Sequence, residues 1–153
     1  MKVRIEIHED LTEDEVVIRC TRINETVLKL QNIVSDLGSN TKSLVLTRGE
    51  TDYFVPQEQI LFFETVGKTV SAHTADKMYE TQYRLYELEE MLPGSFMRIS
   101  KSTIVNLNRI YSITRNLTAS SVIEFSDSIK KVYVSRNYYK ALIERMGEKR
   151  RNL

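Results

Sequence analysis

The sequence predicts an α+β protein that is mostly β, with an antiparallel β-sheet domain and short helices preceded by a small unit of two strands and one helix. Most apolar residues recur with the period of two that half-buried strands show. Turn-forming Gly, Asp and Ser residues separate these runs, and only three segments show the helical period. The length of 153 residues, of which 41% are hydrophobic, fits one globular domain with a modest appendage.

The N-terminal segment combines a strand pattern with a helix pattern. Apolar residues stand at every second position, first at Val3, Ile5 and Ile7 and again at Val16 and Ile18, which predicts two short strands with an acidic stretch between them. Apolar residues then follow at helical spacing over 23–37, and Gly38 stands where a helix C-cap glycine belongs. We therefore expect a ββα arrangement in this segment.

The polar residues 39–42 mark a boundary between two parts of the chain. Residues 1–42 are expected to form the ββα appendage, which is too small to build a stable core alone. Residues 43–153 are expected to form the main domain.

The central part predicts two hairpins and one helix. The strands of the two hairpins are expected at 44–47 and 53–55, and at 60–65 and 69–74. Their turns contain Gly49 and Gly67, residues that tolerate the backbone of tight turns. A short helix is predicted over 82–91, where leucines recur at helical spacing and Pro93 ends the pattern.

The last part of the chain predicts further strands and a basic helix. The strands are expected at 96–99, 109–114, 121–125 and 131–134. A helix rich in Lys and Arg is expected over 136–146.

Several classes of site are disfavoured by the residues present. The two histidines, His8 and His73, lack a second ligand at metal-site spacing, so no metal or other cofactor is expected. Gly67 and Lys68 copy the end of a phosphate-binding loop, but Phe62 stands where that loop needs glycine. The paired carboxylates of Glu89 and Glu90 fit a solvated helix face. We therefore expect neither an enzyme nor a small-molecule substrate.

The sequence also indicates a compartment. Cys20 cannot form an internal disulfide, and its apolar neighbours predict a buried thiol in a reducing environment. We see neither a signal-peptide pattern nor an apolar run long enough to span a bilayer. These features predict a cytoplasmic protein.

Basic residues concentrate at the C-terminal end. Residues 96–153 hold 12 Lys and Arg against 4 Asp and Glu, a net charge of +8, whereas the whole chain has +1. Such an asymmetry is expected of a polyanion-binding surface, although a solvated face balanced by the acidic remainder explains the charge equally well.

Two junctions in this basic region combine residue types that suit DNA. A polar bend at Ser100, Lys101 and Ser102 follows an apolar strand, and Ser135 with Arg136 joins the last strand to the basic helix. Arginine can form two hydrogen bonds with guanine, and Ser and Lys suit phosphate oxygens. The alternative is that the arginines are used in ion pairs; the residues in question are Arg98 and Arg136, with Glu64 and Glu124 as acidic partners.

At these residues the chain resembles the LytTR family of bacterial DNA-binding domains, over about 43–146. The segments that carry the resemblance are Ile60-Leu61-Phe62-Phe63-Glu64 before a Gly-Lys turn, Leu85 to Leu92 ending in Glu-Glu-Met-Leu-Pro, Phe96-Met97-Arg98 through Val105-Asn106, and Val134-Ser135-Arg136. The resemblance implies a mostly β fold that reads double-stranded DNA with loops in successive major grooves. It also implies transcription regulation through imperfect direct repeats.

Carried over by position, the resemblance implies three DNA-contacting loops. They hold Lys68, Thr69 and Val70; Ser100, Lys101 and Ser102; and Ser135 and Arg136, with Lys140 in the helix that follows. Some relatives have a histidine at the position of Val70. The valine side chain suits either contact with a thymine methyl group or an inward position in its strand. Where this chain has Ser100 and Lys101, relatives often have His and Arg or Asn, so its base preference is expected to differ. Asn106 is expected to be structural, and Tyr133 and Tyr139 to pack at the core edge or to reach phosphate.

Many relatives carry a receiver domain of over 100 residues, and we expect none in residues 1–42. Stand-alone relatives resemble regulators that a membrane protein inhibits. We therefore expect residues 1–42 to form a homodimer or to bind such an inhibitory membrane protein, and the sequence does not choose between the two.

Two other functions fit the sequence less well. A protein-interaction module would dock its basic end on an acidic partner. An RNA-binding protein would need exposed aromatic residues in a basic loop for base stacking, and no such loop stands out.

Overall fold

In the computed structural model the chain divides into two units, residues 1–40 and 41–153, and the structure describes residues 2–12, 14–38 and 42–151. In the described residues of the first unit the one regular element is the helix α1 (Glu25–Gly38). Asn24 caps it, because its side-chain Oδ1 accepts a hydrogen bond from the Val27 N–H at 3.0 Å. An ion pair of 2.8 Å between Glu25 and Lys29 supports the first turns.

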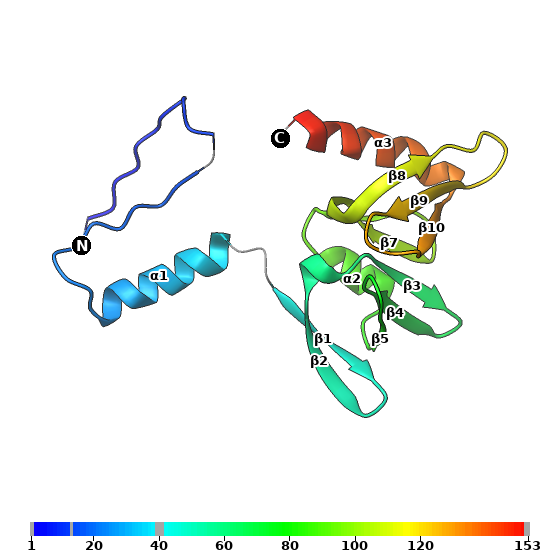
Figure 1. The fold of residues 1–153 in the computed structure, drawn as a ribbon, viewed down its shortest axis with the longest axis horizontal. Helices are drawn as coiled ribbons and strands as arrows, with labels where there is room; N and C mark the ends of the chain where they lie inside the picture. The colour runs from blue at the N-terminus through cyan, green and yellow to red at the C-terminus, as the bar shows by residue number, and fades with distance from the viewer. Residues whose placement is uncertain (1, 13, 39–41, 152–153) are drawn as a thin grey trace. The chain divides into compact units, whose positions relative to one another are not determined.

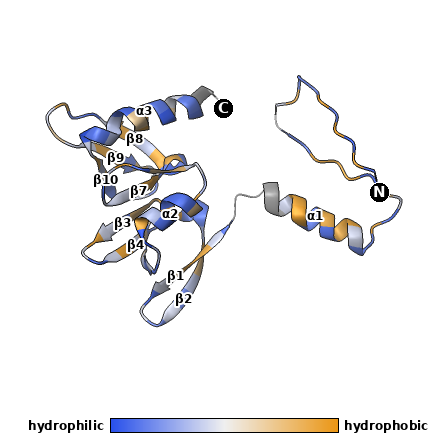
Figure 2. Ribbon diagram, turned by 180° about the vertical axis from the view of Figure 1, so that it is seen from behind, coloured by the Kyte–Doolittle hydropathy of each residue, from blue (hydrophilic) through white to orange (hydrophobic). Residues whose placement is uncertain are grey.

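The two strands predicted before α1 are not formed, which corrects that part of the prediction. Apolar residues do alternate with polar ones over residues 3–7 (Figure 2). However, the side chains of Val3, Ile5 and Ile7 are 90%, 85% and 88% exposed, so burial does not offset the entropy cost of ordering a strand pair. Cys20 is likewise exposed, whereas a buried thiol was predicted.

The second unit is built on two antiparallel sheets (Figure 1). The seven-stranded sheet has the order β2-β1-β5-β4-β3-β7-β6, and the three-stranded sheet has the order β10-β9-β8. The strands of the large sheet are β1 (Ser43–Arg48), β2 (Thr51–Pro56), β3 (Phe62–Val66), β4 (Thr69–His73), β5 (Met78–Thr81), β6 (Phe96–Arg98) and β7 (Thr103–Asn106). Those of the small sheet are β8 (Ile110–Thr114), β9 (Ser121–Phe125) and β10 (Lys131–Val134). The mostly β, α+β fold class predicted from the sequence is confirmed.

Helices cover both sheets. The helix α2 (Leu85–Met91) buries Leu85 and Leu88 against the large sheet, together with Phe63 and Phe96. The helix α3 (Arg136–Arg151) buries Leu142 against a second core that includes Ile123 of the small sheet. Two single turns of 3₁₀ helix, Gln57–Gln59 and Leu107–Arg109, join strands.

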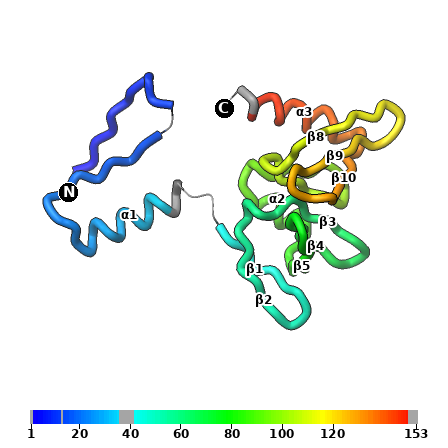
Figure 3. The backbone as a smooth tube through the Cα atoms, viewed as in Figure 1, coloured from blue at the N-terminus to red at the C-terminus, as the bar shows by residue number. Residues whose placement is uncertain are grey.

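Strands β5 and β7 were not predicted as strands, for different reasons. β5 buries only Tyr79, so its sequence lacks a clear apolar alternation. β7 is buried at all four positions between β3 and β6, and such a short apolar run does not show a period of two. The β1–β2 hairpin extends beyond the rest of the large sheet (Figure 3), and its turn uses Gly49 at φ 64°.

Asn106 is structural, as predicted. It is 1% exposed, its Nδ2 donates to the Ile60 carbonyl at 2.9 Å, and its Oδ1 accepts from the Asn108 N–H at 3.1 Å. These bonds anchor the end of β7 to the segment that enters β3.

Candidate DNA-binding surface

The bend between β6 and β7 is held in shape by Arg98 from within. Its Nε donates to the Ser100 carbonyl at 3.2 Å and its Nη2 to the Lys101 carbonyl at 2.6 Å. Its Nη1 forms an ion pair of 3.0 Å with Glu89 on α2. The guanidinium therefore binds two backbone carbonyls and one carboxylate, so Arg98 is a positioning residue for the bend. Glu89 supports this arrangement, a role that the sequence prediction missed.

The serines of the bend add local order. The Ser102 N–H donates to the Ser100 Oγ at 3.2 Å, and the two hydroxyl oxygens lie 3.4 Å apart. The side chain of Lys101, between them, is exposed. The bend thus presents a lysine on an ordered backbone.

Backbone hydrogen bonds join this bend to its two neighbours. The Thr65 N–H, near the end of β3, donates to the Ser102 carbonyl at 2.8 Å. The Ser135 N–H, after β10, donates to the Ile99 carbonyl at 3.0 Å. Segments far apart in sequence are therefore joined at this bend, while its contact with DNA stays a prediction.

The junction between β10 and α3 is fixed by buried side chains on both sides. Val134 and Leu142 are both 0% exposed, and the Tyr138 N–H donates to the Ser135 carbonyl at 3.0 Å. Arg136 and Lys140 are exposed and, being four residues apart in α3, lie on one face of the helix. This geometry directs both charges to solvent from a rigid base.

The β3–β4 turn supplies the third loop. Gly67 adopts φ 62°, and Lys68 and Thr69 are exposed. Val70, in contrast, is 4% exposed and packs in the core under the large sheet, because it points inward from β4. The prediction that Val70 contacts a base is therefore wrong, while Lys68 and Thr69 remain predicted contacts.

The turn and the start of α3 lie on the same side of the second unit (Figure 1). Among the described residues, Lys68, Lys101, Arg136 and Lys140 take part in none of the ion pairs, whereas Arg98, Arg109 and Lys131 are paired with acids. Ion pairing was the alternative role for Arg98 and Arg136, and among the described residues it is found for Arg98 alone. Its partner is Glu89, not Glu64 or Glu124.

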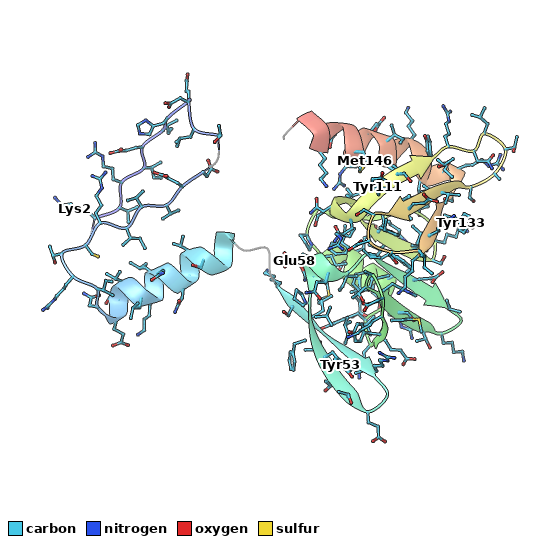
Figure 4. The ribbon with its side chains drawn as sticks, viewed as in Figure 1. Lys2, Tyr53, Glu58, Tyr111, Tyr133 and Met146 are labelled. Atoms are coloured by element: carbon cyan, nitrogen blue, oxygen red, sulfur yellow. The ribbon has the colours of Figure 1, made fainter. Side chains whose placement is uncertain are left out.

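The sequence prediction also missed Arg115, in the loop between β8 and β9. Its guanidinium carbon lies 5.4 Å from the centre of the Tyr139 ring, and Tyr139 packs against the second core. A cation–π contact of this kind places an exposed charge beside the start of α3. Tyr133 is 60% exposed on β10 (Figure 4), so of its two expected placements the one packed at the core edge is not formed, and a contact with phosphate stays a prediction.

Comparison with known proteins agrees with this geometry. The family model for the LytTr DNA-binding domain matches residues 50–147. The chain belongs to the LytTR DNA-binding domain family. The resemblance to the LytTR family noted in the sequence is confirmed, and this is a family of DNA-binding regulators, not of enzymes.

Relatives of similar length support the assignment to the LytTR family. A protein from Staphylococcus aureus strain NCTC 8325 described as an HTH-type transcriptional regulator is 31% identical over 147 residues, which cover 96% of this chain and 99% of the relative. A counterpart from strain MRSA252 is 30% identical over the same length. A Bacillus cereus LytTr DNA-binding domain of known structure shares the fold, with a TM-score of 0.64, 24% identity and coverage of 69% of this chain and 97% of that domain.

The LytTR unit does not place two consecutive helices together. Five strands separate α2 from α3, so over residues 42–151 no helix-turn-helix is formed. Of the helices in the described ranges, none has the length and apolar character needed to cross a membrane.

Proposed function

We propose that the chain is a cytoplasmic transcription regulator that binds double-stranded DNA in a sequence-specific way, through the three loops that end β3, β6 and β10. The loops lie in successive major grooves, and the protein recognises imperfect direct repeats. The main support is the pair of backbone hydrogen bonds from Thr65 and Ser135 that hold the loops in one array. Further support comes from Lys68, Lys101, Arg136 and Lys140, which form no ion pair with the described acidic residues.

Each loop has its own task in this proposal. Arg136 and Lys101 reach base edges or phosphates from a fixed backbone, and Arg136 has the fork suited to guanine O6 and N7. Lys68, Thr69, Ser100, Ser102, Ser135 and Lys140 contact phosphates and set the position of the protein on the duplex. Arg115 adds a phosphate contact beside α3.

Replacing Arg136 tests the base-reading role. We expect Arg136→Ala to weaken binding to the selected site by about 1–3 kcal/mol and to relax the sequence preference, because the bidentate contact is lost. Lys68→Ala is the matched control, since loss of a phosphate contact weakens all duplexes alike and lowers the salt slope by about 1. The measurement is fluorescence anisotropy on a duplex enriched from a random pool, over a range of salt concentrations. A variant that keeps the full preference would remove Arg136 from base reading, and a pool without enrichment at low salt would defeat the proposal.

Replacing Arg98 tests whether the bend must be held in shape. Arg98→Lys keeps the charge but loses the fork that binds two carbonyls and Glu89, so we expect about tenfold weaker DNA binding with an unchanged circular dichroism spectrum. Arg84→Lys, at an exposed arginine before α2, is the control and should bind as the wild type does. If Arg98→Lys also binds normally, the bend does not depend on the fork.

The second candidate function is a protein-interaction module that docks an acidic partner, and the same selection from a random pool of duplexes tests it. It predicts salt-sensitive binding with equal affinity for every duplex and for unrelated polyanions. We propose that residues 1–42 control the regulator, either by forming a homodimer or by binding an inhibitory membrane protein.

A further inference from the structure

The first unit exposes apolar side chains along its N-terminal segment. Val3, Ile5 and Ile7 are all more than 80% exposed, and Val16 and Val17 follow at 66% and 62%. Burying a side chain of this size stabilises a protein by about 1.5–3 kcal/mol. Exposed apolar surface on this scale, in a unit with one helix, marks a binding face.

Two copies of this chain supply what one copy lacks. In one copy the two segments with strand pattern form no strand pair, and such a pair is marginal unless it packs against a helix or against further strands. A pair of copies offers four strand segments and two helices. A second copy would therefore give the strand pattern of residues 3–7 a pairing partner.

The charges of the first segment are self-complementary in one orientation. In an extended strand Arg4 and Glu6 share one face, and their side chains already form an ion pair of 2.8 Å. If two copies pair antiparallel with Ile5 opposite Ile5, each Arg4 faces the second copy's Glu6 and each Val3 faces the second copy's Ile7. Parallel pairing in register would place Arg4 opposite Arg4, and like charges directly opposite destabilise a strand pair.

We propose that residues 3–7 pair with the same residues of a second copy as antiparallel strands across a two-fold axis at Ile5. The interface is isologous, because residue 4 contacts residue 6 and residue 6 contacts residue 4. The apolar face of the strand pair packs against the two α1 helices, whose Leu28 and Ile33 are 48% and 56% exposed in one copy. This proposal chooses between the two tasks left open for residues 1–42, and it does not depend on DNA recognition.

Charge reversal tests this pairing in the full-length chain. Arg4→Glu and Glu6→Arg each place like charges opposite one another in a homodimer, so we expect each variant alone to dimerise at least about tenfold more weakly than the wild type. Neither variant keeps the ion pair within its own chain. In an equimolar mixture of the two, every position 4 again faces the opposite charge at position 6, so a heterodimer should form. Sedimentation velocity at a series of concentrations measures all four samples.

Two further variants separate the apolar contact from general surface effects. Ile5→Asp puts two carboxylates on the axis and should give a monomer, whereas Ile129→Asp, at a residue 97% exposed in the second unit, should leave the mass unchanged. Hydrogen exchange at residues 3–7 should slow as the wild-type concentration rises. A monomeric wild type at 100 μM, a dimer that survives Ile5→Asp, or a mixture no tighter than either charge variant would each overturn the proposal.

Discussion

Leu142→Ala is expected to lower the free energy of unfolding by about 2–5 kcal/mol, the range for leucines truncated in a packed core. Leu142 is 0% exposed and lies in the second core with Ile123 and Val134. Most of the remaining surface of α3 is polar or charged, so the helix depends on this packing for its stability. Because α3 begins at Arg136, its loosening should also weaken DNA binding.

Urea unfolding followed by circular dichroism measures this effect. Leu117→Ala is the matched control, because Leu117 is 76% exposed in the loop between β8 and β9, and we expect a change within about 0.5 kcal/mol. A loss under 1 kcal/mol for Leu142→Ala would show that α3 is held by other contacts.

His73 is expected to make the fold sensitive to acid. Burial, and then the nearby Lys130 ammonium, lower the pKa of His73 from 6.5 to about 4. Its ring stacks on Phe62 at 4.3 Å, and its buried Nδ1 has no hydrogen-bond partner. Glu64 lies 3.6 Å from Nε2 and favours the charged form, but this carboxylate is partly exposed and does not offset the burial.

The unfolded chain therefore binds a proton more readily than the folded chain between pH 6.5 and 4. The stability contributed by neutral His73 is present above pH 6.5 and is lost as the pH falls towards 4, by up to about 3 kcal/mol. We expect His73→Phe, which keeps the ring stack, to remove this part of the pH dependence in urea unfolding between pH 7 and 4. His8→Gln, at an exposed histidine, should keep it. Equal slopes for wild type and His73→Phe would contradict the assignment.

The hairpins and the helices could be predicted from the sequence because their signals are local. Gly49 and Gly67 do occupy turns with positive φ, and leucines at helical spacing do form α2. The order of the strands could not be predicted in this way. β7 lies between β3 and β6, and nothing in its four buried residues indicates those neighbours.

The candidate site could likewise be predicted only in part, because residue types are visible in the sequence and contacts between distant segments are not. Lys68, Lys101 and Arg136 were named from residue type and family position, and backbone hydrogen bonds from Thr65 and Ser135 join the bend to its neighbouring segments. The inward direction of Val70 depends on its register opposite Thr65 and Thr81, which alternation alone left open. Arg98 and Glu89 are nine residues apart, and their contact needs α2 and β6 to lie side by side.

The way Arg98 holds the bend separates the shape of this loop from its chemistry. The Arg98 guanidinium donates to the carbonyls of Ser100 and Lys101, and the Thr65 N–H donates to the carbonyl of Ser102. The Lys101 side chain takes part in none of these hydrogen bonds. Position 101 can therefore accept other residues without a change in the path of the backbone. If the bend reads DNA as proposed, a single substitution at position 101 would change the target sequence with little cost to the stability of the fold.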